Sequence, residues 1–294
     1  MRKFATFTLA VAALLAVPAA ASAALQQQAI VKLSPTAGAL APKGKNYVKV
    51  SAYLSTRDAA STRPQMKANP VGKVVMAFPP GSTINPKATP GCHMNQYAQV
   101  GLLKTGCAKS LIGMGWALVN TGWDGAAARA QLTDLPGGPN SPGPCAVDDA
   151  TQYTRTFEVA GNPDCVPVGH IWNRVYAYQG AIINGKYNLN GIIFASDNAV
   201  AGIAFGGTTR ANALTVPLPA INGVGSGAGE LPFGWVLSDF QLNITKPNYL
   251  KAGACTASHK WIVKSTINFS NFKADPVGPP PASQVLNTVV PCKV

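Results

Sequence analysis

Charged residues are scarce in this chain, and acidic residues are scarcer than basic ones. Only 12% of the 294 residues are charged, against 47% that are apolar. This balance excludes an intrinsically disordered chain, which combines few apolar residues with many charged ones. The sustained 3.6-residue periodicity of long helices is also missing, which argues against a helical bundle. Glycine and proline are abundant instead, at 29 and 24 residues, without a collagen-like repeat.

The chain also has few residues suited to catalysis or to metal binding. It contains three histidines and no C-x-x-C, and His93 has no second ligand at a recognised zinc spacing. Asp148, Asp149 and Asp164 lack the D-x-D-x-D-G spacing of a calcium loop, so we interpret them as a solvated turn. Residues 223–227 depart from the G-x-S-x-G nucleophile elbow. We therefore expect no cofactor, no metal and no catalytic residues.

Residues 1–23 have the three parts of a secretory signal peptide. Arg2 and Lys3 precede an apolar stretch at 4–17, which Ala21-Ser22-Ala23 follows as a cleavage site. The apolar stretch is shorter than the roughly 20 residues that a membrane-spanning helix needs. We predict cleavage before Ala24, which lowers the formal net charge from +13 by two, to +11. The expected product is secreted or associated with the cell envelope, without a transmembrane segment.

An exported chain meets an oxidising environment, in which cysteines pair. The six cysteines allow several connectivities. We predict that sequence neighbours pair, as Cys92–Cys107, Cys145–Cys165 and Cys255–Cys292.

Period-two alternation of apolar and polar residues dominates the chain and predicts short strands with one buried face. It is clear at 48–54, 236–244 and 261–269, and in the last segment it directs Trp261, Val263, Ser265, Ile267 and Phe269 inward. Asn184-Gly185 predicts a tight hairpin. Further strands are predicted at 73–78, 113–120, 128–132, 154–160, 170–178, 191–195, 199–205, 214–218 and 284–290.

Many short strands between glycine- and proline-rich loops predict an all-β fold, an antiparallel β-sandwich or a jelly-roll-like arrangement. We assign residues 24–45 to a loosely ordered N-terminal arm and residues 46–294 to the sandwich domain. Two stacked sandwiches that meet near Val166 are the alternative.

Residues 78–117 carry a more specific pattern. A P-x-G turn at 79–81 leads to Cys92 and then to C-x-x-S-x-I-G-x-G-x-A at 107–117. This pattern resembles a group of uncharacterised secreted, disulfide-bonded, β-rich proteins of actinobacteria. Ala108 stands where that group usually has proline. The resemblance implies a secreted β fold and carries no known activity. Gly113 and Gly115 are predicted to be structural, at a bulge or a close backbone approach, because no helix follows them.

The segment 170–178 is the best candidate for a ligand-binding surface. Alternation places Trp172, Arg174, Tyr176 and Tyr178 on one face. Such a row of aromatic rings with polar groups could stack on sugar rings. The alternative is that this face is packed against protein, with Arg174 extending to its edge.

The excess of basic residues makes an anionic envelope polymer or glycan the expected partner. A surface that only keeps the protein soluble explains the charge equally well. Nucleic acid is not expected, because lysine and arginine are scattered and no recognition motif is present. The sequence thus predicts a secreted, non-catalytic structural or binding module. The alternative is a secreted hydrolase that acts on envelope polysaccharide or ester.

Overall fold

The computed structural model describes residues 28–34, 47–55, 71–120, 142–143, 145, 165–166, 170–197, 203–218, 236–269 and 283–292. The predicted signal peptide, the predicted strands at 128–132 and 154–160, and the Asp148, Asp149 and Asp164 group lie outside these residues.

The described residues form strands with few helical turns. The strands are β1 (Gln28–Ser34), β2 (Tyr47–Ser55), β3 (Val71–Ala77), β4 (Thr83–Ile84), β5 (Leu111–Asn120), β6 (His170–Ile183), β7 (Lys186–Asp197), β8 (Ile203–Arg210), β9 (Ala213–Pro217), β10 (Val236–Ile244), β11 (Leu250–Lys251), β12 (Lys260–Phe269) and β13 (Ser283–Pro291). The α-helix α1 (Val100–Gly106) lies between the 3-10 turns η1 (Pro86–Ala88) and η2 (Ala108–Ser110). The all-β prediction is confirmed.

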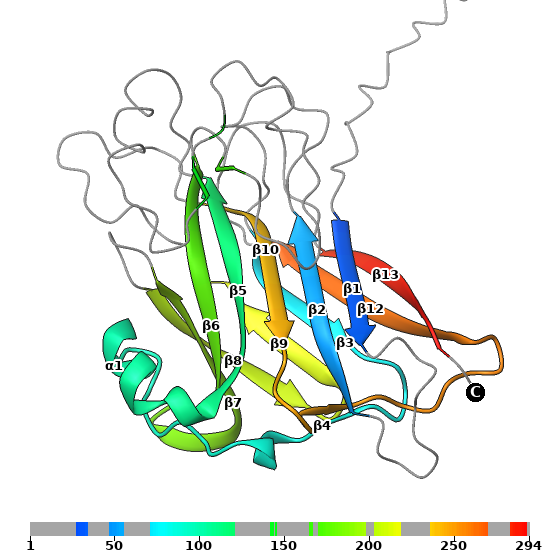
Figure 1. Ribbon diagram of the computed structural model, residues 1–294, viewed down its shortest axis with the longest axis horizontal. Coiled ribbons are helices and arrows are strands. Elements are labelled where there is room, and N and C mark those ends of the chain that lie inside the picture. The colour runs from blue at the N-terminus through cyan, green and yellow to red at the C-terminus, as the bar shows by residue number, and fades with distance from the viewer. Residues whose placement is uncertain are drawn as a thin grey trace, which may run out of the picture.

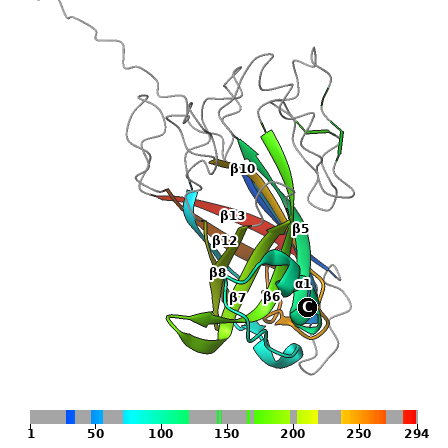
Figure 2. The same cartoon turned by 90° about the vertical axis from the view of Figure 1, so that its left-hand side faces the viewer.

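All described strands belong to one antiparallel sheet. Its order is β13-β12-β3-β9-β8-β7-β6-β5-β10-β2-β11-β4, and β1 also pairs with β2. β1 and β13, from opposite ends of this order, are in contact and lie side by side (Figure 1). The sheet is therefore rolled, and Figure 2 shows β12 and β13 passing behind β10 and β5. The two facing layers are parts of one continuous sheet.

The interior of the roll is built from the inward side chains of facing strands. On one side, Ala52 of β2 pairs with Leu242 of β10. On the other, Val74 of β3 pairs with Val216 of β9. These apolar rows belong to one large buried cluster, which matches the alternation of the sequence. The inward row predicted for β12 is confirmed from Trp261 to Ile267.

Residues 89–110 cover part of the outer face of the roll. Leu103 of α1 is buried in a second apolar cluster with Tyr178 of β6 and Ile193 of β7. Figure 2 shows α1 lying in front of these strands. The Cys92–Cys107 disulfide closes this covering segment. Cys145–Cys165 and Cys255–Cys292 are also paired, so the predicted pairing of sequence neighbours is confirmed.

Two predicted backbone features are also confirmed. Asn184 and Gly185 both have positive φ (53° and 73°), as the tight turn between β6 and β7 requires. Gly113 and Gly115 lie where β5 approaches β10 so closely that a Cβ atom would collide with the carbonyls of Asn243 and Gln241. Their role here is a close backbone approach.

The N-terminal region differs from the expectation of a loose arm over 24–45. Residues 28–34 form β1 and pair with β2 from Gln28↔Ser55 to Ser34↔Lys49. Val166, where the alternative of two stacked sandwiches places their junction, lies between β5 and β6 in the chain. These two strands are neighbours in the same sheet. In the part of the chain that is described, no helix is both long and apolar enough to cross a membrane.

Candidate functional site

The aromatic row predicted on β6 is largely covered by protein. Trp172 and Tyr178 are only 3% and 2% exposed, so neither ring presents a face to solvent. Trp172 packs with Tyr53 and Trp116, whereas Tyr178 packs with Leu103 under α1. For these two residues the structure corresponds to the packed alternative, so they do not form an exposed stacking platform.

Arg174 and Tyr176 of the same row are half-buried and engaged within the chain. The Arg174 guanidinium lies 5.8 Å from the centroid of the Trp172 ring. The Lys104 ammonium lies 5.0 Å from the centroid of the Tyr176 ring. Both geometries are those of cation–π contacts. The four predicted residues are thus divided between two packed clusters.

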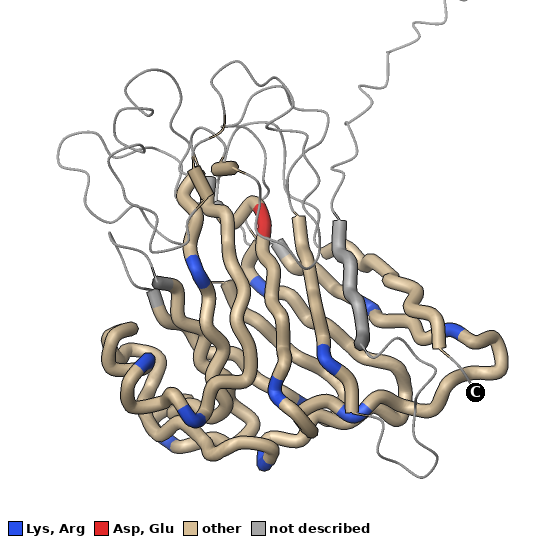
Figure 3. Tube along the Cα trace, viewed as in Figure 1, with Lys and Arg blue, Asp and Glu red and all other residues tan. Residues whose placement is uncertain are grey.

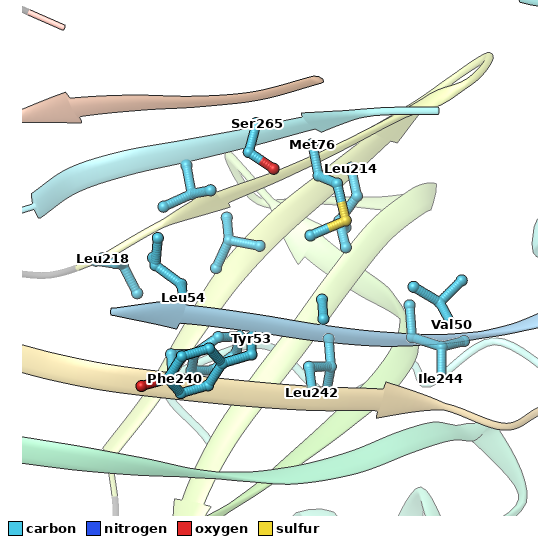
Figure 4. A pocket seen from close by; sticks show the side chains of 13 residues that line it. Val50, Tyr53, Leu54, Met76, Leu214, Leu218, Phe240, Leu242, Ile244 and Ser265 are labelled. Carbon is cyan, nitrogen blue, oxygen red and sulfur yellow. The ribbon is translucent and has the colours of Figure 1, made fainter. Parts of the chain in front are cut away.

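A different site lies inside the rolled sheet (Figure 4). It is a cavity between the β2 and β10 wall and the facing wall of β3, β9 and β12. Figure 4 shows side chains from both walls extending into this space. The lining consists of Val50, Ala52, Tyr53, Leu54, Val74, Met76, Leu214, Val216, Leu218, Phe240, Leu242, Ile244 and Ser265. None of these side chains is charged.

The cavity is narrow. Its total empty volume is about 590 Å³, a value that includes the crevices between side chains and the part that is open to solvent. The volume in which the centre of a water-sized sphere fits is about 30 Å³, above the roughly 10–15 Å³ that one water needs. The smaller value limits what can enter without movement of the walls, because it counts only the positions open to the centre of a water-sized sphere. This space equals that of about two or three waters, so an alkyl chain of more than a few carbons fits only when side chains of the walls move, and the flexible Met76 thioether is the wall group most able to yield.

Ser265 is the polar exception in this lining. It is 1% exposed, and its Oγ has no hydrogen-bond partner. Figure 4 shows this oxygen directed into the space beside Met76 and Leu214. An unpaired buried hydroxyl costs about 1–3 kcal/mol of folding free energy. Alternation in the sequence already placed Ser265 on the inward face of β12, but it could not show that the hydroxyl has no partner.

The other hydroxyl in the lining is already used. Tyr53 Oη donates a hydrogen bond of 2.7 Å to Asp239 Oδ1. Asp239 is buried, and it does not line the cavity. Among the described lining residues, Ser265 is therefore the polar side chain available to a ligand.

Tyr249 stands at one end of the interior. Together with Val50, Leu214 and Ile244 it lines a small space next to the cavity. These three residues also line the cavity itself, whereas Tyr249 does not. Its hydroxyl donates a 2.7 Å hydrogen bond to Gln179 Oε1. Burial raises the pKa of the Tyr249 phenol well above its ordinary value of 10.0. The phenol is therefore a neutral donor, and this end of the interior remains uncharged.

The described residues do not bring together a metal-binding cluster. They contain no group of three His, Cys, Asp or Glu side chains. His93 stacks on the ring of Tyr187 at a centroid distance of 4.4 Å. Residues 223–227 and the three carboxylates considered in the sequence, Asp148, Asp149 and Asp164, lie outside the described residues.

Comparison with protein-family models, with curated proteins and with solved structures finds no match for this chain. The geometry of the site therefore has to indicate its function.

Proposed function

We propose that the protein is an exported, non-catalytic binding module that holds a small apolar molecule inside its rolled sheet. The observation that carries this proposal is the uncharged cavity between the two facing walls. Small-molecule sites are typically concave and mostly apolar, with few polar groups that fix orientation. The three disulfides support export, because they form and persist in oxidising compartments. The predicted signal peptide and the resemblance to secreted actinobacterial proteins point the same way.

The energetic argument rests on apolar burial. A chain that enters the cavity removes its own apolar surface from water, which contributes about 25 cal/mol per Å² of buried area. The backbone of both walls is held by strand pairing, so the cost of admitting a ligand lies mainly in moving side chains such as Met76, and slim chains need the least movement. Slim linear alkyl chains are therefore the expected ligands.

The test is a titration of the purified, disulfide-bonded chain with linear alkanes from hexane to dodecane. A ligand that binds only the folded state raises the thermal midpoint in proportion to its affinity and concentration. We expect the midpoint to rise with alkane concentration. A larger side chain in the Ala52→Leu variant should fill the cavity and abolish the rise.

The control is Ile193→Ala, which removes buried side-chain atoms from the second cluster, away from the cavity. It should lower the free energy of unfolding by the cost of a core truncation, about 2–5 kcal/mol, and therefore lower the midpoint, but it should keep the alkane response. An unchanged midpoint for every alkane with the unaltered chain would contradict the proposal.

The charge distribution favours a second candidate function, attachment to an anionic envelope polymer or glycan. Every lysine or arginine whose side chain is described is exposed or half-buried. Asp239 is the one acidic side chain described, and it is buried. Figure 3 shows the basic residues distributed over many strands and loops. Such a surface attracts polyanions through long-range electrostatics, which salt screens.

This second function predicts salt-sensitive retention on isolated cell-wall fractions. We expect retention at low ionic strength and release as salt shortens the screening length. Lack of retention at low salt would exclude it, and retention that persists at high salt would exclude an electrostatic cause.

A further inference from the structure

We propose that Ser265 is the recognition group of the cavity, and that the ligand is a slim, uncharged alkyl chain with one oxygen acceptor, such as a ketone or an ester. This inference rests on the proposed function, because it names the ligand class of the same site. It depends on the buried Oγ of Ser265, which is directed into the cavity and has no hydrogen-bond partner.

The position of Ser265 orients the ligand. Ser265 pairs with Met76 of β3, and Met76 pairs with Leu214 of β9, so these three residues form one row across the wall. Figure 4 shows Leu218, Leu54 and Phe240 on one side of this row and Val50 and Ile244 on the other. A ligand with its oxygen at Ser265 therefore extends its alkyl chain along apolar side chains.

The lining also selects against charge. The described lining residues offer neither a cation nor an anion. A carboxylate or an ammonium group would be buried there without a counterion, which strongly disfavours binding. A carbonyl oxygen needs only one donor, and a serine hydroxyl supplies one. The acceptor is therefore uncharged.

Water is a poor substitute for such a ligand. A buried water typically needs two to four polar partners. The described lining provides only the Ser265 hydroxyl, because Tyr53 Oη is bonded to Asp239. A ligand oxygen at the end of an alkyl chain satisfies Ser265 and fills the apolar remainder of the cavity at the same time.

Calorimetric titration of the full disulfide-bonded chain with methyl octyl ketone, decane and decanoate tests this inference. We expect the ketone to bind at least tenfold more tightly than decanoate. Ser265→Ala should weaken ketone binding about fivefold, the contribution of one hydrogen bond, and leave decane binding unchanged. Ser238→Ala is the matched control, because it removes a buried hydroxyl that donates to Leu118 O, outside the cavity lining. It should change neither affinity.

A second measurement does not require a variant. The infrared carbonyl stretch of the bound ketone should move to lower frequency than that of the ketone in an alkane solvent, because a hydrogen bond weakens the C=O bond. An unshifted carbonyl, tighter binding of decanoate, or an equal effect of Ser265→Ala on ketone and decane would each overturn the role of Ser265. Failure of all three ligands to bind would overturn the proposed function itself.

Discussion

At the scale of single residues, Tyr249 makes the stability of the fold depend on alkaline pH. Its buried phenol donates to Gln179 Oε1, and burial raises its pKa above the ordinary value of 10.0. The Gln179 amide in turn donates to Gly191 O at 3.1 Å. The neutral phenol thus anchors a hydrogen-bond network that joins the β11 region to β6 and β7.

The raised pKa of Tyr249 predicts alkaline destabilisation with a definite sign. Above pH 10 the unfolded chain releases this proton while the folded chain retains it. Ionisation of Tyr249 should therefore lower the free energy of unfolding by about 1.4 kcal/mol for each pH unit above 10. Below the unfolded pKa both states keep the proton, so this group adds no pH dependence there. Chemical denaturation at a series of pH values measures this slope.

Tyr249→Phe isolates the contribution of the phenol. The variant keeps the ring and loses the hydrogen bond, so it should be less stable at neutral pH by about 1–3 kcal/mol. Its alkaline slope should be shallower than that of the unaltered chain. Equal slopes for the two proteins would show that Tyr249 does not cause the alkaline loss.

At the scale of elements, the approach of β5 to β10 depends on the absence of a side chain. A Cβ at Gly115 would collide with the backbone carbonyl of Gln241. Gly115→Ala should therefore lower the free energy of unfolding by about 1–3 kcal/mol, as overpacking does. Gly101 of α1 offers a matched control, because a Cβ added there would meet no atom within 4 Å.

Gly101→Ala should leave the stability unchanged or raise it by about 0.5–1 kcal/mol, because alanine is the better helix former. Urea denaturation of both variants measures the difference. Similar losses for Gly101→Ala and Gly115→Ala would contradict a specific contact between β5 and β10.

The elements that the sequence predicted are those with a local signal. β10 begins and ends at the predicted residues, 236 and 244, because alternation depends only on neighbouring positions. The hairpin at Asn184 follows from the conformational preference of its two turn residues. The helix α1 was not predicted, because seven residues without a side-chain cap are too short to show a helical period.

Features that depend on distant partners could not be predicted. β1 pairs with β2, a partner that no local signal in its own residues indicates, so these residues alone suggest a loose arm. On the outer face of β6, Tyr178 is buried because residues 89–110 pack over it, and Trp172 is buried against Tyr53 and Trp116, although alternation alone is compatible with an exposed row. Ser265 could be placed inward, but the facing wall that leaves its hydroxyl unpaired is set by the order of the strands.

At the scale of the whole molecule, rolling the sheet is what creates the candidate site. The β2 and β10 wall and the β12, β3 and β9 wall lie in opposite parts of the strand order, and the cavity lies between them. The contact between β1 and β13 brings the two parts together on one side. The outer surface carries the exposed cations, whereas the cavity lining carries no charge.

The central claim is that an apolar ligand occupies this interior, and intermolecular nuclear Overhauser effects test it most directly. The measurement uses decane and the disulfide-bonded chain with labelled methyl groups. The account predicts contacts from decane to the methyls of Leu214, Val216 and Leu242, which line the cavity. Contacts confined to exposed methyls such as those of Ile262 and Val289 would contradict it.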